Sequence, residues 1–349
     1  MVMDRATFPR DKVCAGWITP PVVADLALDV EDYRQARTFQ PFTGFRTGII
    51  GEHDEVETSY GHAVSFGIRR CEFDDYLLRR SDARLTLGAP IESIRRDGAR
   101  WTINDRVKAA VLVAAGGHFC PVARWLNGPP SRDARGSVVV AQEAELAIEP
   151  ADADAFTTAP GVPELYFCRD LKGYGWCVRK QQYLNVGFGR LDHRSLPRAT
   201  AEFIAFLKAT RKIPADRSWR WRGHAYAVND DSTDRRVVDA GALVVGDAAG
   251  LAYPLSGEGI RPAIESGLLA ALTIIEAAGR YSRDRLEPYE QRLRARFGVS
   301  RVARTLSRIL PAGLEKLLAR ELLGTPRFVR HVVLDRWFLH AHEPALAAG

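Results

Sequence analysis

One stretch of 26 residues constrains the fold of this chain more than any other feature. It runs from Ala242 to Gly267 and reads ALVVGDAAGLAYPLSGEGIRPAIESG. Its apolar start, up to Gly246, is typical of a short strand that is buried on both faces of a sheet. Asp247 follows at the carboxyl end of that strand, which is the edge of an open α/β sheet where ligands bind. The stretch therefore predicts an α/β protein with a ligand site at this edge.

The second half of the stretch predicts a glycine-rich turn and the start of a helix. Gly257 and Gly259 lie in the turn, and Pro262 is tolerated in the first helical turn. Apolar residues then recur every four positions on one helical face: Ile260, Ile264, Leu268 and Leu272. The amides of a first helical turn lack partners within the helix, so they suit an anion or an electron-rich carbonyl. The alternative is a strand-to-helix turn without this ligand, as in any α/β protein.

The segment GDAAGLAYPLSGEGIRPAIESG resembles the second FAD-binding motif of flavoproteins with the p-hydroxybenzoate hydroxylase fold, in their geranylgeranyl reductase branch. The resemblance implies a doubly wound FAD-binding domain, interleaved with a mixed or antiparallel β-sheet substrate domain and followed by C-terminal helices. It also implies that Asp247 accepts a hydrogen bond from the ribityl or pyrophosphate-proximal part of the flavin. The helix start from Gly257 to Ile260 would face the pyrimidine ring.

The N-terminal segment carries a second resemblance. DRATFPRDKVCAGWITP, from Asp4 to Pro20, is similar to the family segment that directly follows the first βα unit. The match places Asp4 where the acid for the adenosine ribose stands. The GxGxxG turn that normally opens this unit is not found, so we expect roughly 30 residues to be missing. A late start codon, a fragment and a genuine loss are the three explanations. Without the missing strand, we expect the chain as printed to fold poorly, to bind FAD weakly, or both.

Two further segments resemble cofactor-binding parts of the family. Arg70, Phe73, Asp74 and Leu77 match R-x-x-F-D-x-x-L on a helix expected over 67–80, with Arg69 as the alternative contact. The stretch 111–126 resembles A-D-G-x-x-S-x-x-R only in part, because glycine and cysteine replace the acid and the serine. The resemblance thus implies this set of FAD-binding residues: Asp4, Arg70, Arg124, Gly246, Asp247, Pro254, Gly257, Glu258, Gly259 and Ile260.

The segment YGWCVRK resembles the Y-x-W-x-F-P-K motif that lies along the substrate pocket of geranylgeranyl reductases. Tyr174, Trp176 and Lys180 match, and they are the predicted substrate-binding residues. Tyr174 and Trp176 alternate onto one face of a strand, where simple cross-strand packing is the alternative. Cys14 stands where the family has a cysteine facing the flavin, although a packed cysteine is the commoner case. Cys14 and Tyr174 are the catalytic candidates, and neither is clearly the proton donor.

Composition limits the number of domains and the classes of ligand that the chain can have. The 349 residues are 46% hydrophobic, enough for two interleaved domains, and the net charge of +6 permits phosphate ligands or anionic membranes without specifying either. Five scattered cysteines without a CxxC pair fit a reducing cytoplasm, and the absence of HExxH leaves no metal to propose. No aromatic-interleaved basic patch indicates nucleic acid. The predicted division is 1–20, 60–132 and 236–283 for FAD, 21–59 and 133–235 for substrate, and 284–349 for C-terminal helices.

These features predict a FAD-dependent oxidoreductase. By resemblance, NAD(P)H or another donor reduces the flavin, which delivers hydride to a small-molecule double bond, with isoprenoid lipids as one substrate class. A flavin monooxygenase of the same fold is one rival, and a non-catalytic remnant or lipid-binding module is another. Helices rich in arginine near the C-terminus, with apolar positions over 306–317, predict a cap on the substrate domain or an interfacial helix on anionic membrane. The sequence leaves the oligomeric state open.

Overall fold

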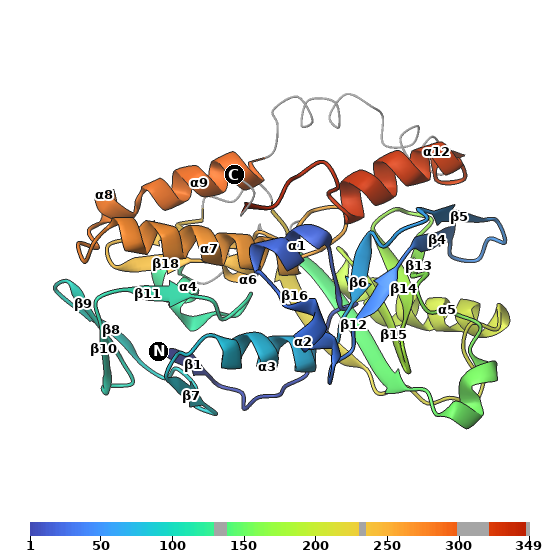
Figure 1. The fold of residues 1–349 in the computed structure, drawn as a ribbon, viewed down its shortest axis with the longest axis horizontal. Coiled ribbons are helices and arrows are strands. Elements are labelled where there is room, and N and C mark those ends of the chain that lie inside the picture. The colour runs from blue at the N-terminus through green and yellow to red at the C-terminus, as the bar shows by residue number, and fades with distance from the viewer. Residues whose placement is uncertain (129–137, 230–234, 299–320, 347–349) are drawn as a thin grey trace. The chain divides into compact units, whose positions relative to one another are not determined.

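The computed structural model describes residues 1–128, 138–229, 235–298 and 321–346. The chain divides into two compact units (Figure 1). The first combines Met1–Arg10, Leu77–Val138 and Tyr226–Arg308, and the second combines Asp11–Tyr76, Val139–Ala225 and Ile309–Gly349. Each unit is thus built from segments that are distant in sequence.

The first unit contains short parallel and antiparallel sheets. β1 (Val2–Asp4) pairs in parallel with β7 (Leu85–Leu87). A second sheet pairs β18 (Ala242–Val244) in parallel with β11 (Leu112–Ala114) and antiparallel with β17 (Val238–Asp239). The third is the antiparallel set β8 (Ile94–Asp97), β9 (Arg100–Ile103) and β10 (Val107–Ala109).

Helices cover the β11–β18 sheet and share its core. They are α4 (Pro121–Asn127), α6 (Gly246–Ala249), α7 (Ile260–Glu276), α8 (Arg283–Leu286) and α9 (Pro288–Phe297). Leu243 and Val244 of β18 are buried in this core together with Tyr289 of α9, whose hydroxyl donates to the Val244 carbonyl at 2.7 Å. The central strand and the helices that follow it therefore form one packed body, which fixes the turn between β18 and α7.

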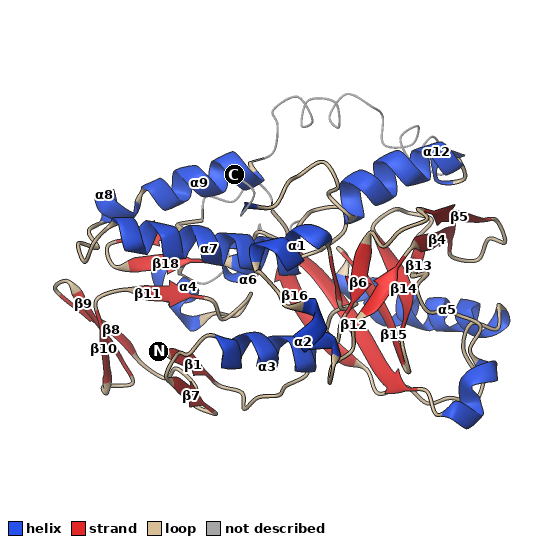
Figure 2. Ribbon diagram, in the orientation of Figure 1, coloured by secondary structure: helices blue, strands red, loops and turns tan. Residues whose placement is uncertain are grey.

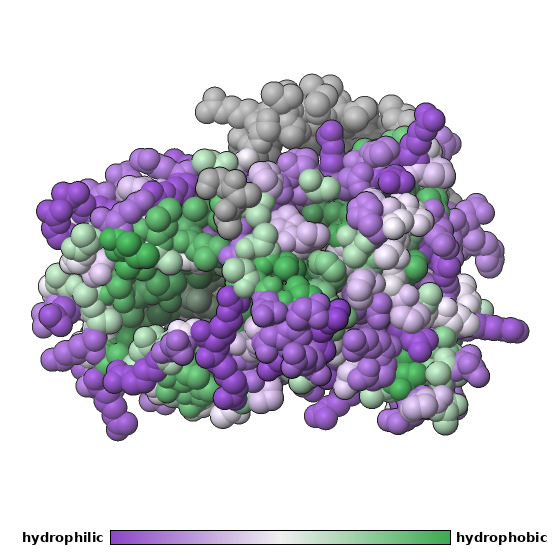
Figure 3. Space-filling view, in the orientation of Figure 1, coloured by the Kyte–Doolittle hydropathy of each residue, from purple (hydrophilic) through white to green (hydrophobic). Residues whose placement is uncertain are grey.

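The apolar stripe of α7 does not lie in that core. Leu268 and Leu272 are 38% and 45% exposed, and Val113 of β11 is 44% exposed. Figure 3 shows apolar residues gathered on the face of this unit that carries α7 and β11. The buried face of α7 instead carries Arg261 and Glu265, which are fully enclosed.

The second unit is built on one large mixed sheet. Its strand order is β16 (Arg222–Ala227), β12 (Val138–Ala147), β15 (Tyr183–Arg190), β14 (Gly173–Lys180), β13 (Glu164–Phe167), β4 (Gly44–Ile49) and β5 (Glu55–Ser59). β13 and β4 run in parallel, whereas the pairs β12–β15, β15–β14, β14–β13 and β4–β5 are antiparallel. A small sheet of β2 (Trp17–Ile18), β6 (Ser65–Gly67) and β3 (Gln40–Phe42) belongs to the same unit.

Helix α5 (Leu196–Ala209) covers one face of the large sheet (Figure 2), where Phe203 packs against Phe188 of β15. The remaining helical segments of this unit are α1 (Pro20–Asp25), α2 (Val30–Arg34), η2 (Pro150–Ala155), η3 (His193–Ser195), α12 (Pro326–Phe328) and η4 (Val329–Phe338). Helix α3 (Arg70–Arg80) begins in this unit and ends in the other.

The predicted α/β class with a mixed sheet is confirmed, as are the buried strand before Asp247 and the helix that begins at Ile260. Two element boundaries were wrong. The helix expected over 67–80 begins at Arg70, because 65–67 pair with two strands of the small sheet. The strand expected over 107–115 is two strands, β10 and β11, which pair with different partners.

The predicted division into FAD and substrate domains is a statement about ligands and stays a prediction. The apolar positions over 306–317, on which the interfacial helix was predicted, lie outside the described residues. Within the part of the chain that the structure describes, the helices are too short or too polar to cross a membrane.

Glycine opposite a tryptophan gives a direct test of the large sheet. Gly187 of β15 pairs with Trp176 of β14, and a Cβ at Gly187 would overlap the indole ring. We expect Gly187→Ala to lower the free energy of unfolding by about 1–3 kcal/mol, the usual cost of overpacking. Gly189→Ala, two residues along the same strand, is the control, because its Cβ would lie 3.6 Å from Ala141. Equal urea denaturation midpoints for both variants would contradict this packing.

Candidate functional site

The turn between β18 and α7 brings the aspartate and the glycines of the sequence motif together. A Cβ on Gly259 would lie 2.9 Å from Oδ1 of Asp247, so the carboxylate rests against the glycine backbone at the start of α7. Gly257 has φ +68°, a conformation that favours glycine, and a Cβ there would overlap the Tyr226 hydroxyl. Close backbone approach of this kind is only open to glycine.

The start of α7 also keeps part of its hydrogen-bonding capacity. Gly259 is the N-cap residue and has no side-chain cap. Glu258 Oε1 accepts a hydrogen bond from the Arg261 amide at 2.7 Å, so one amide of the first turn is taken by the protein itself. Ile260, the first helical residue, is 8% exposed. The N-terminal amides with the positive end of the helix dipole suit an electron-rich ligand group.

Buried polar side chains hold this turn against α7. The Gly246 amide donates to Ser266 Oγ at 3.0 Å. One turn away, Arg261 Nε donates to Glu265 Oε1 at 2.7 Å, and Arg296 of α9 donates to both oxygens of the same carboxylate at 2.7 Å. Because Arg261 and Glu265 are fully buried, this pairing is needed to avoid an uncompensated charge in the core.

The other predicted FAD-binding residues of this unit are more scattered. Asp4 is half-buried at the carboxyl end of parallel strand β1, and its Oδ1 accepts from the Ala6 amide at 2.8 Å. Arg124 is exposed on α4, and Pro254 is exposed in the loop between α6 and α7. Their contacts with FAD stay predictions.

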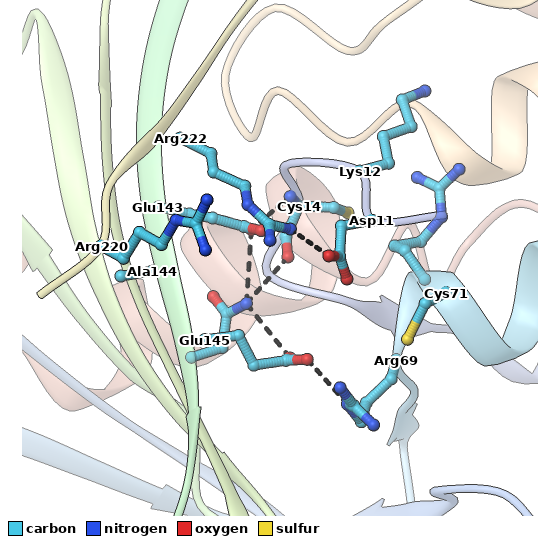
Figure 4. Close-up of a pocket in the computed structure, with 12 residues that line it drawn as sticks. Asp11, Lys12, Cys14, Arg69, Cys71, Glu143, Ala144, Glu145, Arg220 and Arg222 are labelled. Atoms are coloured by element: carbon cyan, nitrogen blue, oxygen red, sulfur yellow. Dashed lines mark hydrogen bonds and ion pairs between the residues drawn. The ribbon is translucent and has the colours of Figure 1, made fainter. Parts of the chain in front are cut away.

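The second unit places Cys14 in a polar cavity of about 170 Å³ (Figure 4). The cavity is formed by the N-terminal segment, the start of α3, strands β12 and β15, and the segment leading into β16. Its lining residues are Asp11, Lys12, Cys14, Arg69, Arg70, Cys71, Glu143, Ala144, Glu145, Asn185, Arg220 and Arg222. A volume of this size is below the roughly 300–1,000 Å³ of a site for a whole drug-sized ligand.

A hydrogen-bonded chain fixes the backbone of Cys14. Trp176 Nε1 donates to Asn185 Oδ1 at 2.7 Å, and Asn185 Nδ2 donates to the Cys14 carbonyl at 3.2 Å. The Cys14 amide donates to Glu143 Oε2, which also accepts from Asn185 Nδ2 at 3.3 Å. The predicted substrate residue Trp176 is 6% exposed, so it acts on the cavity through Asn185.

The side chain of Lys180 also holds the Cys14 segment in place. Its Nζ donates to the carbonyls of Ala15 at 3.1 Å and Ile68 at 3.0 Å, and lies 2.7 Å from Glu145 Oε2. These three acceptors match the three donors of an ammonium group. The side chain is 1% exposed. Its part in substrate binding stays a prediction, and the contacts that the structure gives it are with the backbone next to Cys14, with Ile68 and with Glu145.

Two carboxyls on β12, two residues apart, have pKa values that are shifted in opposite directions. Burial raises the pKa of the Glu143 carboxyl to about 7, against the lowering effect of the Cys14 amide, Asn185 and Lys180. Burial also raises the pKa of Glu145, but its pairing with Lys180 and with Arg69 outweighs this and lowers it to about 2. Near neutral pH one carboxyl is close to its midpoint and its neighbour is ionised.

Arg70 is committed to a partner on its own helix. Its Nε and Nη2 donate to the two oxygens of Asp74 at 2.7 and 2.8 Å. Burial lowers the pKa of the guanidinium, but the charges of Asp74 and Cys14 outweigh this effect and raise it. The alternative Arg69 pairs instead with Glu145 at 2.8 Å and lies over the Tyr183 ring. Both arginines line the cavity, and the structure does not separate their roles.

Tyr174 lies on the same face of β14 as Trp176, with ring centroids 6.0 Å apart. It is half-buried and packs edge-on against Phe338 of η4 at 5.3 Å. The predicted alternation of the two aromatic residues is thus present. Whether Tyr174 is catalytic stays a prediction, and it is not among the residues that line the cavity.

Sequence reasoning missed Glu143, Glu145 and Asn185. The signal was there: two carboxyls two residues apart in the strand VVVAQEAELA, and an asparagine within the apolar strand YLNVGFGR. Acidic residues on one face of a strand that is otherwise apolar need buried partners. Which partners they have depends on pairing across strands, which the local sequence does not display.

Comparisons with known proteins find reductases of the kind that the sequence motifs resemble. The menaquinone reductase of Mycobacterium tuberculosis is 28% identical over 304 residues, covering 78% of this chain and 69% of that protein. The digeranylgeranylglycerophospholipid reductase of Methanocaldococcus jannaschii is 26% identical over 253 residues, covering 68% and 62%. No family model matches.

Solved structures show the same fold. A geranylgeranyl bacteriochlorophyll reductase-like protein from Thermoplasma acidophilum has a TM-score of 0.69 at 19% identity, over 93% of this chain and 81% of that one. The halogenase PltM, solved with phloroglucinol and FAD, has a TM-score of 0.64 at 16% identity, over 97% and 80%.

The chain resembles the geranylgeranyl reductase-like flavoproteins. The resemblance predicted from the Asp247 motif and the N-terminal segment is thereby confirmed. The fold is that of FAD-dependent oxidoreductases. Halogenases share it, so the fold alone does not choose between the chemistries of these groups.

The Lys180–Glu145 pair predicts a pH-dependent stability. The ordinary pKa of 4.5 and the folded value of about 2 mean that Glu145 stabilises the protein above pH 4.5, and that this contribution is lost as the pH falls toward 2. A shift of this size corresponds to stabilisation on the order of 3 kcal/mol. Glu145→Gln should therefore be less stable than wild type at pH 7, with the gap closing near pH 2. Urea unfolding at several pH values measures it, and a gap that is independent of pH would contradict the pairing.

Proposed function

We propose that the protein is a FAD-dependent oxidoreductase that reduces a double bond of a small isoprenoid-type molecule, with NAD(P)H as the electron donor. The observation that carries this proposal is the turn in which Asp247 lies against Gly259 at the start of α7. The names of the relatives support the substrate class, since one is called a menaquinone reductase and another a digeranylgeranylglycerophospholipid reductase. The donor rests on the family resemblance alone.

The residues of the turn fit a flavin. A Cβ at Gly257 would overlap the Tyr226 hydroxyl and a Cβ at Gly259 would crowd the Asp247 carboxylate, so the two glycines let these side chains lie against the backbone of the turn. Asp247 offers an acceptor for a ligand hydroxyl, and the N-terminus of α7 stabilises negative charge. When bound, FAD would supply hydride chemistry, which no side chain provides.

The protein's own contribution is binding, orientation and proton supply. In the second unit, Trp176, Asn185 and Lys180 fix the Cys14 segment at the wall of the cavity. The cavity admits the reacting end of a substrate and surrounds it with charged side chains. Membrane docking by the C-terminal region remains a separate proposal, which suits a lipid substrate.

The role of Asp247 is tested by FAD binding. We expect Asp247→Asn to bind FAD about 10- to 100-fold more weakly after reconstitution, since a hydrogen bond to a charged group contributes about 1.5–3 kcal/mol. Flavin absorbance retained after gel filtration and FAD titration by fluorescence measure the change. Asp284→Asn, an exposed acid at the start of α8, is the matched control and should bind like wild type.

Circular dichroism must show that both variants are folded. Equal FAD affinity for Asp247→Asn and wild type would remove the turn from the binding site. A folded version of the chain that is extended by a GxGxxG unit and stays colourless with excess FAD would favour the non-catalytic alternative, and oxygen consumption equal to product formed would favour a monooxygenase.

A further inference from the structure

Glu143 is a buried carboxyl that faces the cavity without a cationic partner of its own. It is 6% exposed on β12, and its hydrogen bonds come from the Cys14 amide and from Asn185. Glu145, on the same strand and the same face, is paired with Lys180 and Arg69. Two neighbouring carboxyls thus lie in one wall of the cavity. Of the two, only Glu145 has cationic partners among the described residues.

The donors of these hydrogen bonds identify the oxygen that carries the proton. Both donate to Oε2, and among the described residues none donates to Oε1. A protonated carboxyl has one hydroxyl donor and keeps the acceptor capacity of its other oxygen. Because Oε2 is already accepting two hydrogen bonds, the proton resides on Oε1.

The charges around Glu143 come from every element that forms the cavity. They are Asp11, Lys12, Arg69, Arg70, Glu145, Lys180, Arg220 and Arg222, with the thiols of Cys14 and Cys71. Burial still holds the pKa of Glu143 at about 7, near the operating pH at which a general acid works best. Two carboxyls whose pKa values are pushed apart are a recurring acid and electrostatic pair in enzymes.

We propose that Glu143 donates the proton, from Oε1, that completes reduction of a substrate double bond in this cavity. The inference rests on the proposed function, because it requires the reduced flavin as the hydride source. Hydride forms one bond to the substrate, the π bond breaks, and its electron pair takes the proton of Glu143. The residue is left as a carboxylate and regains a proton from water, so atoms and charge balance.

Glu143 fits this role better than the candidates from the sequence. Tyr174 is not among the residues that line the cavity. Cys14 lines it, but its Sγ accepts a hydrogen bond from the Gly16 amide at 3.4 Å, and its backbone is what Glu143 holds in place. Cys14 is then a wall residue beside the acid.

The first test needs neither cofactor nor substrate. Protein labelled with [5-¹³C]glutamate is titrated by NMR, and the resonance of Glu143 is assigned as the one lost in Glu143→Gln. We expect its midpoint near pH 7 in wild type. Glu31→Gln, an exposed surface change in the same unit, should leave that resonance unmoved. A Glu143 midpoint below about 5, the ordinary range for a glutamate, would overturn the inference.

The second test measures the reaction itself. Saturation of a prenyl double bond in a short-chain prenylated naphthoquinone by the reduced, FAD-loaded protein is followed in a single turnover by quenched flow and mass spectrometry between pH 5 and 9. The wild-type rate should fall as the pH rises through about 7, because the protonated acid is the active form. Glu143→Gln should lose this dependence and react on the order of 100-fold more slowly. Glu143→Asp should still react more slowly as the pH rises, but with a shifted midpoint and a lower rate than wild type, and Glu31→Gln should react like wild type.

The outcomes separate the two proposals. Reduction of the prenyl double bond by Glu143→Gln at the wild-type rate, or with the wild-type pH profile, overturns the donor role and leaves the proposed function standing. A wild-type protein that binds FAD but does not reduce that double bond counts against the proposed function, and the donor role falls with it. Should Glu143→Gln not fold, the Glu143→Asp profile decides, since an unchanged midpoint and rate would overturn the inference.

Discussion

The buried ammonium group of Lys180 joins several segments of the second unit. Lys180 is almost fully enclosed, so its ammonium must be satisfied by the backbone carbonyls of Ala15 and Ile68 and by Glu145. The glycines beside it follow from the same requirement. A Cβ on Gly16 would lie 2.8 Å from Nζ, and a Cβ on Gly67 would lie 2.8 Å from Cγ of the lysine stem. The lysine thereby ties the Cys14 segment and β6 to the large sheet.

Glu143 and Glu145 show how one strand produces two different acids. They share a face of β12, yet of the two only Glu145 has cations within ion-pair distance among the described residues. The desolvation that both experience is therefore compensated by ion pairs at Glu145 and not at Glu143. The ionised carboxylate fixes Lys180 and Arg69. The titrating one holds the Cys14 amide and faces the cavity. Glu145 therefore holds the surrounding side chains in place, while its neighbour Glu143 is the carboxyl that can exchange a proton.

The first unit relies on close approach and not on charge at its ligand edge. Asp247 reaches the start of α7 only because position 259 has no side chain, and Ser266 holds the Gly246 amide from the other side. The buried Arg261–Glu265–Arg296 cluster stabilises the helix behind this turn. Rigid support behind a backbone site keeps its amides in position for a ligand.

The sequence by itself determined the strand before Asp247, the helix from Ile260, most strands of the large sheet and the resemblance to flavin-dependent reductases. Those features are local, since a short apolar run, a proline in a first helical turn and glycines at fixed spacing carry their meaning within a few residues. Tertiary structure alone decided that 65–67 form a strand and that the apolar stripe of α7 is exposed at Leu268 and Leu272. It also decided that Glu143, Asn185 and Cys14 meet, because their hydrogen bonds join residues that are 42 and 129 positions apart and no local pattern encodes such distances.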